Sequence, residues 1–136
     1  IIIWCRFRWE VETIYQMYKE MASYIYGGLT DKKREAVLTR WKNNDFCRIM
    51  VGMPSAAKFG HTWLKANYVI YYSGTEDYED YAQSRDRNYR RGQTRPVTEI
   101  KIITKNTIER RVWYCIATKK KVDKFLKDFY IEKAKG

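Results

Sequence analysis

The sequence has few of the residues that build disulfides, metal sites and acid–base catalysts. Its 136 residues include three cysteines and a single histidine, His61. Cys5, Cys47 and Cys115 are far apart and none has the C-x-x-C spacing of a zinc ligand pair, so we expect neither a disulfide framework nor a bound metal. Unpaired thiols suit a reducing, cytoplasmic compartment. No nucleophile and base stand together, which argues against a stand-alone small-molecule enzyme.

Two longer patterns are also missing. No apolar run approaches the ~20 residues that span a bilayer, so we expect no membrane helix and no membrane partner. No G-x-x-x-x-G-K-S/T loop is present, so the chain lacks the usual phosphate-binding half of a nucleotide site. The sequence opens at Ile1 inside an apolar run without an initiator Met, and we expect a piece of a longer protein.

Positive charge is what the sequence has in excess. Lys and Arg number 27 against 16 Asp and Glu, which gives a formal net charge of +11. This balance favours a polyanionic partner, with nucleic acid as the first candidate. Hydrophobic residues make up 45% of the chain, enough for the core of one domain. The twelve tyrosines fall mostly in apolar stripes, where packing is expected rather than base stacking.

Short apolar runs alternate with amphipathic stretches along the whole chain. This alternation predicts an α/β fold with a mostly parallel sheet and helices on both faces. The loops beyond the carboxyl ends of the strands are then the expected functional surface. Strands are expected near 1–5, 24–26, 47–51, 68–72 and 97–103, and helices near 11–22, 30–41, 78–91 and 107–131.

Residues 83–93 carry the most informative pattern. Gln83, Arg87 and Arg90 have helical offsets of 0, +4 and +7, which place them on one face if the segment is a helix. Two guanidiniums held close together repel each other unless an anion lies between them, and the Arg fork matches phosphate oxygens. The pattern therefore predicts a polyphosphate site. The plainer alternative is a solvated basic helix face.

The same segment resembles the last helicase motif of the second RecA-like domain in superfamily-two helicases. The branch it resembles is that of the Swi/Snf-type ATPases and their small phage and bacterial relatives. The resemblance implies a RecA-like three-layer sandwich over residues 1–136, within a bacterial or phage-encoded protein. It departs from the family pattern at residues 57–64, where a Gly-Gly pair is missing. The matching residues are Gln83, Asp86, Arg87, Arg90, Gly92 and Gln93, with supporting segments at 1–7, 26–41, 66–70 and 104–109.

By this resemblance, ATP and Mg²⁺ bind between two RecA-like domains, and the absent N-terminal domain holds most of both. Arg90 is then the arginine finger, Arg87 a second phosphate contact, and Gln83 the residue that orients them. Gly60 belongs to the same nucleotide-binding set. The whole protein is expected to be an ATP-dependent helicase or translocase, while the isolated chain lacks ATPase activity.

The nucleic acid, DNA rather than RNA, is expected to be held by its backbone without base reading. The plainer alternatives are surface charge for the arginines, a tight turn for the glycines and a helix cap for Ser55. A competing function is a non-catalytic nucleic-acid-binding or interaction domain on the same fold. The candidate contact residues are Arg6, Arg8, Gly27, Gly28, Ser55 and Lys58.

Overall fold

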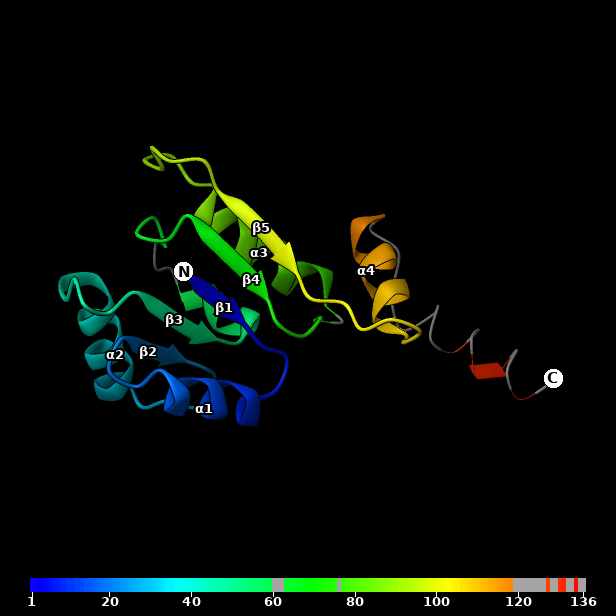
Figure 1. Ribbon diagram of the computed structural model, residues 1–136, viewed down its shortest axis with the longest axis horizontal. Helices are drawn as coiled ribbons and strands as arrows, with labels where there is room; N and C mark the ends of the chain where they lie inside the picture. The colour runs from blue at the N-terminus through cyan, green and yellow to red at the C-terminus, as the bar shows by residue number, and fades with distance from the viewer. Residues whose placement is uncertain (60–62, 76, 119–126, 128–129, 132–133, 135–136) are drawn as a thin grey trace.

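The structure is a computed structural model that describes residues 1–59, 63–75, 77–118, 127, 130–131 and 134 (Figure 1). Five strands alternate with helical elements along the chain. The strands are β1 (Ile2–Trp4), β2 (Ala22–Ile25), β3 (Ile49–Gly52), β4 (Tyr68–Tyr71) and β5 (Thr98–Lys101). The helices are α1 (Arg8–Met17), α2 (Asp31–Asn43), the 3₁₀ helix η1 (Pro54–Phe59), α3 (Tyr78–Asn88) and α4 (Glu109–Ala117).

All five strands are parallel and lie in the order β2-β3-β1-β4-β5. The central strand β1 pairs with β3 through Ile3 and Val51 and with β4 through Ile3 and Ile70. Helices cover both faces of the sheet, with α1 on one face and α3 on the other (Figure 1). The predicted α/β class, with a parallel sheet between helical layers, is confirmed.

The core lies where β1, β3 and the loop before β4 meet. Trp4 and Trp63 are fully buried and contact each other edge to face, with ring centroids 6.0 Å apart. Gly52 ends β3 beside them, where a Cβ atom would lie 2.7 Å from the Ile25 carbonyl oxygen and 3.1 Å from the Trp4 ring. No larger residue fits there without moving the backbone of β2, so this close approach requires glycine.

Two helices differ in extent from those expected. The helix expected over 11–22 begins at Arg8 and ends at Met17, because the Glu10 carboxylate accepts a hydrogen bond from the Phe7 amide (3.0 Å) and closes the first turn. Arg8 therefore lies in a helix and not in a loop. The helix expected over 78–91 ends at Asn88, and Gly92 follows in a turn with a φ of +106°.

Acidic residues lie at the start of α3, with Asp77 as its N-cap and Glu79 and Asp80 in its first turn. Asp77 is its N-cap and accepts a hydrogen bond from the Glu79 amide (2.8 Å), so this carboxylate serves the helix end. The closing helix begins at Glu109 as α4, and most of its expected continuation to 131 lies outside the described residues.

Candidate nucleotide and nucleic-acid sites on opposite edges of the sheet

The arginine segment lies at the amino edge of the sheet, the edge where the strands begin. A helix that follows a parallel strand must run back along the sheet, so α3 ends beside the starts of β4 and β5. The Trp63 amide donates to the Arg87 carbonyl oxygen (3.4 Å), and the Tyr89 hydroxyl donates to the carbonyl oxygen of Val97 (3.4 Å). Arg87 and Arg90 therefore lie at the amino edge, on the side of the sheet opposite the loops that the sequence analysis expected to form the functional surface.

The turn after α3 is fixed to the loop that leads into β4. Asn88 is fully buried, and its amide nitrogen donates to the carbonyl oxygen of Trp63 (3.2 Å). The Gln93 amide nitrogen donates to the carbonyl oxygens of Leu64 (3.3 Å) and Ala66 (3.1 Å). Gln93 was recognised in the sequence as part of the motif without a role, and the structure gives it one. Gln93 holds the turn that carries Arg90 against the loop before β4.

The side chains of Gln83, Arg87 and Arg90 take no part in these hydrogen bonds. Gln83 and Arg87 are half-buried and lie one turn apart on α3, whereas Arg90 is exposed and follows the helix end. The predicted single helical face therefore holds for two of the three residues. Within the described part of the chain, none of these three side chains has a hydrogen-bond or ion-pair partner. Two guanidiniums without internal carboxylates suit an anion that comes from outside.

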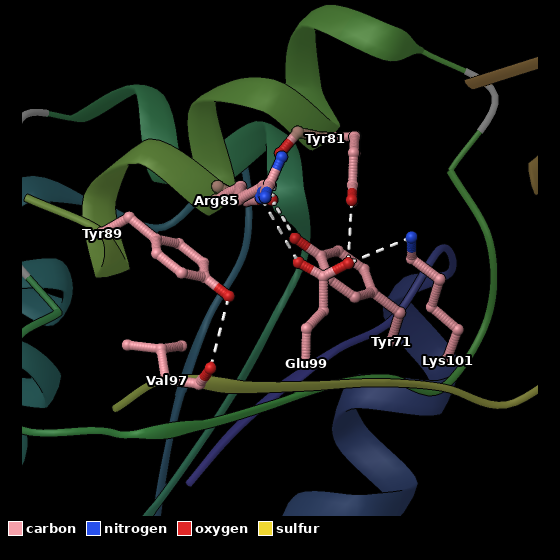
Figure 2. Close-up of polar contacts among 8 residues, drawn as sticks. Tyr71, Tyr81, Arg85, Tyr89, Val97, Glu99 and Lys101 are labelled. Carbon is pink, nitrogen blue, oxygen red and sulfur yellow. Dashed lines mark hydrogen bonds and ion pairs between the residues drawn. The ribbon is translucent and has the colours of Figure 1, made fainter. Parts of the chain in front are cut away.

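The opposite side of α3 is anchored to β5 through Glu99 (Figure 2). Its carboxylate accepts a hydrogen bond from the Tyr81 hydroxyl (2.8 Å) and pairs with Lys101 (3.0 Å) and, more loosely, with Arg85 (3.7 Å). Burial acts to lower the pKa of Lys101, but the hydrogen bonds with Tyr81 and Glu99 outweigh it and raise that pKa. Arg85 therefore has a charged partner within the described chain, whereas Arg87 has none.

A buried tyrosine completes this anchor. The hydroxyl groups of Tyr71 and Ser84 are 2.8 Å apart, and Ser84 also donates to the Tyr81 carbonyl oxygen (2.8 Å). Burial raises the pKa of Tyr71 above its usual range, so its hydroxyl stays protonated. The anchor therefore fixes α3 on the sheet from one side, while Gln93 fixes its end.

The carboxyl edge is organised around Glu10, a buried carboxylate in the first turn of α1. Ser73, directly after β4, donates from its hydroxyl to Glu10 Oε2 (2.7 Å) and accepts from the Arg6 amide (2.6 Å). These bonds join the loop after β1 to the loop after β4. Sequence reasoning missed Glu10, although a Glu three residues after the N-cap is a capping-box signal, and it placed Ser73 in a functional loop without a role.

The same carboxylate acts on Cys5. Burial, and then the negative charge of Glu10, raise the pKa of the Cys5 thiol to about 12. The thiol is therefore protonated at neutral pH and is not a nucleophile. Cys5, Cys47 and Cys115 are all buried and free.

The candidate arginines of this edge are partly engaged by their neighbours. Arg8 pairs with Glu12 (2.8 Å) and lies over the Tyr26 ring, 4.5 Å from its centroid. The Arg6 guanidinium lies 5.0 Å from the centroid of the Phe7 ring. The guanidinium group of each arginine therefore lies against an aromatic ring, and Glu12 partly neutralises the charge of Arg8.

The remaining candidates are divided by the structure. Gly27 and Gly28 follow β2, and Gly28 has a φ of +88°, which supports the tight-turn interpretation for that residue. Ser55 is half-buried in η1, directly after β3, and thus belongs to the carboxyl edge. Lys58 has its backbone in η1, while its side chain and all of Gly60 lie outside what the structure describes.

Neither a metal cluster nor a membrane span is found in the described residues. They contain no group of three or more His, Cys, Asp or Glu side chains placed to hold a metal ion. None of the helices in this part of the chain is both long and apolar enough to cross a bilayer.

A parallel α/β sheet in this order, with arginines at the end of its fourth crossover, defines the class of RecA-like motor domains. The family model described as "Helicase conserved C-terminal domain" matches residues 1–92, which include Gln83, Arg87 and Arg90. The chain therefore belongs to the helicase conserved C-terminal domain family.

The relatives confirm the Swi/Snf-type branch. The chain is 34% identical over 88 residues to the DNA excision repair protein CSB of rice, covering 64% of the chain and 7% of that protein. It is 27% identical over 117 residues to the chromatin-remodeling ATPase INO80 of Candida albicans, covering 83% of the chain and 8% of the relative. The chain thus spans less than a tenth of either protein. Both come from eukaryotes, so they give no support to a bacterial or phage source.

A solved structure shows the same fold. The C-terminal part of the Fun30 ATPase domain superposes with a TM-score of 0.73 at 23% identity. The match covers 83% of the chain and 37% of the Fun30 chain. At this identity the similarity bears on the RecA-like fold alone.

Proposed function

We propose that this chain is the C-terminal motor domain of an ATP-dependent helicase or translocase that acts on DNA. In this function, ATP and Mg²⁺ bind between this domain and an N-terminal RecA-like domain of the same protein. The amino edge described here supplies arginines to the phosphates. The buried free thiols of the chain fit the reducing, cytoplasmic compartment expected from the sequence.

The observation that carries the proposal is the contrast among the arginines of residues 83–95. Arg85 pairs with Glu99, and Arg95 donates to the Lys65 carbonyl oxygen (2.6 Å), so both hold the fold together. Arg87, Arg90 and Arg91 have no polar partner among the described residues, and of these only Arg87 and Arg90 belong to the motif. A charge left without an internal partner at a rigid helix end is suited to stabilise a developing negative charge, and the γ-phosphate of ATP develops such charge during transfer.

Arg90 is the better candidate for the finger. It lies beyond the last turn of α3 and is exposed, so a facing domain can reach it. Arg87 is half-buried on the helix and suits a fixed phosphate contact. Gln83, one turn earlier, supports the position of Arg87 and of the nucleotide.

The carboxyl edge supplies the nucleic-acid contacts in this proposal. Arg6 and Arg8, the turn at Gly27 and Gly28, and Ser55 all lie at the ends of strands on that edge. Their guanidinium groups, amides and hydroxyl are donors suited to phosphate oxygens. Lys58 belongs to the same group by its place in η1.

The test is ATP turnover of the full-length protein that contains this domain, with DNA present. Arg90→Ala is expected to lower kcat by about 10³- to 10⁵-fold, the usual effect of losing an arginine finger. Arg91→Ala is the matched control, because Arg91 is an exposed neighbour outside the motif. Equal turnover in the wild type and Arg90→Ala contradicts the finger assignment.

A non-catalytic nucleic-acid-binding domain remains the second candidate, because the chain alone has no phosphate loop. The sequence upstream of Ile1 separates the two functions. A phosphate-loop Lys and an acidic Mg²⁺ pair in that segment support the motor, and their absence supports the binding domain.

A further inference from the structure

One aromatic side chain stands apart from all the others of its type. The sequence has five tryptophans, and four of them are nearly or fully buried. Trp9, in the first turn of α1, is 64% exposed. Phe7, two residues earlier, is 44% exposed. Large aromatic groups left in water at one place are a feature of binding surfaces, since they gain most when a partner covers them.

The two rings form an ordered surface. Their planes are nearly parallel, with an angle of 13° between them and 6.4 Å between the ring centroids. The Arg6 guanidinium lies 5.0 Å from the Phe7 centroid, a cation–π distance. We call Arg6, Phe7 and Trp9 the stacking surface. Successive bases of a single strand are also nearly parallel, so such a surface presents rings in the orientation that bases need.

The backbone beneath the stacking surface is held in place from inside the protein. Glu10 is buried and accepts from the Phe7 amide (3.0 Å), while Ser73 accepts from the Arg6 amide (2.6 Å). Trp9 follows within the first turn of α1. A partner that binds this surface therefore loses little energy to ordering it, which favours affinity.

Charge decides what kind of partner fits. Each exposed ring has an arginine beside it in the sequence, and the whole chain carries a net charge of +11. A surface for another protein's core is expected to be depleted of charge at its centre. Flat rings interleaved with cations instead fit a polyanion that also has flat faces. Single-stranded nucleic acid has both properties, because its phosphates are charged and its unpaired bases expose their π-faces.

We propose that the stacking surface binds an unpaired base of the nucleic acid, with Trp9 as the main contact. This inference rests on the proposed function and deepens it, because it names a base where contacts to backbone alone were expected. The carboxyl edge then distinguishes single strands and opened duplex from intact duplex. Paired bases, which are covered by their neighbours in the stack, do not offer a face to Trp9.

The exposure of Trp9 alone gives a direct probe. Its fluorescence is the part of the tryptophan emission that iodide in solvent quenches readily, since the other four rings are buried. Titration of the chain with an oligothymidylate of about twelve nucleotides is expected to quench that part of the emission. An abasic oligonucleotide of the same length and charge is expected to bind without comparable quenching, because it has phosphates and no bases.

Substitutions then separate stacking from charge. Trp9→Ala is expected to weaken binding of oligothymidylate about 5- to 150-fold, the range that corresponds to loss of one stacked base. Trp9→Phe is expected to keep most of the affinity and lose the quenching. Phe46→Ala is the matched control: Phe46 is 82% exposed and precedes β3 at the amino edge, so binding is expected to be unchanged. Circular dichroism of each variant verifies its fold.

Three results overturn the inference, and they differ in what they say of the proposed function. Equal quenching by a dumbbell duplex without free ends, or unchanged affinity in Trp9→Ala, removes the stacking. If the stacking fails in this way but Arg8→Ala still makes the affinity for oligonucleotides less dependent on salt concentration, the chain binds their phosphates and the proposed nucleic-acid function stands. If no oligonucleotide binds at all, both the stacking and the nucleic-acid proposal fail, and the exposed rings are then a surface for another protein.

Discussion

The arginine side chains at the two edges of the sheet differ in the partners they have. At the amino edge, Arg87 and Arg90 have no polar partner among the described residues, although the backbone around them is held by Asn88 and Gln93. At the carboxyl edge, Arg8 pairs with Glu12 and stacks on Tyr26. Arginines without internal partners on a backbone held in place are suited to stabilise the negative charge that develops when a phosphate is transferred. A partly neutralised edge with exposed rings is suited to the long polyanion with flat faces that we propose as its ligand.

The comparison also concerns what each residue does for stability. Removal of a side chain without polar partners is expected to change the free energy of unfolding little. A buried carboxylate such as Glu10, which accepts two hydrogen bonds, contributes to folding first. The predictions below separate these two roles, from the largest expected effect to the smallest.

After Arg90→Ala, the largest effect is expected at the amino edge for Arg87→Ala. In the full-length protein, kcat for ATP is expected to fall about 10²- to 10³-fold, as for loss of one preorganised donor. The free energy of unfolding is expected to change by less than about 0.5 kcal/mol, since the side chain has no internal partner to lose. Arg87→Lys keeps the charge without the fork and is expected to recover only part of kcat. A stability loss as large as the activity loss contradicts the role.

At the carboxyl edge, Glu10→Ala is expected to act on stability. The Phe7 amide and the Ser73 hydroxyl both lose a buried acceptor, which costs about 2–4 kcal/mol in the free energy of unfolding. Urea unfolding followed by circular dichroism measures this change. Glu10→Gln keeps one acceptor oxygen and is expected to cost less. An unchanged unfolding midpoint in Glu10→Ala shows that Glu10 does not join the two loops.

Gln93→Glu tests the clamp that positions the arginine turn. The variant replaces the amide donor by a carboxylate oxygen that faces the carbonyl oxygens of Leu64 and Ala66, at a cost of about 1–3 kcal/mol. Thr94→Ala, at the exposed next position, is the control. If Gln93→Glu unfolds at the same urea concentration as the wild type, the amino edge is held by other contacts.

The smallest effect at neutral pH is expected for Cys5, whose raised pKa lowers stability only in alkali. The pKa of the Cys5 thiol is raised to about 12 in the folded chain, so the unfolded chain releases this proton first as the pH rises. Stability is full below pH 9 and is then lost at no more than about 1.4 kcal/mol per pH unit up to pH 12. Cys5→Ala is expected to remove the loss of stability that begins near pH 9. The loss caused by the buried hydroxyl of Tyr71, which begins near pH 10, is expected to remain. Identical slopes in both proteins contradict the burial of this thiol.

Much of the fold follows from short-range patterns in the sequence. The alternation of apolar runs with amphipathic stretches is a local property, and it located all five strands and the helices α1, α2 and α3. Helix ends depend on single hydrogen bonds, so the early start of α1 at Arg8 and the early end of α3 at Asn88 were not foreseen. Capping by Glu10 has a recognisable signal, whereas the Gln93 clamp depends on a loop 27 residues away.

The residues of the proposed nucleotide site come from the sequence, but their place in the fold does not. The spacing of Gln83, Arg87 and Arg90 identified the motif, because the family pattern is a pattern of letters. Its location at the amino edge depends on the direction in which α3 crosses the sheet. The exposure of Trp9 was not foreseen either, since an aromatic residue near an apolar strand reads as core in a sequence.

The most direct test of the two-edge account is hydrogen–deuterium exchange of the full-length protein with each ligand added separately. An ATP analogue is expected to slow exchange in peptides that cover residues 83–93, and a single-stranded oligonucleotide in peptides that cover 5–9 and 26–28. Two separate footprints on these segments are the result the account predicts. A nucleotide footprint at residues 5–9 and 26–28, with none at 83–93, contradicts it.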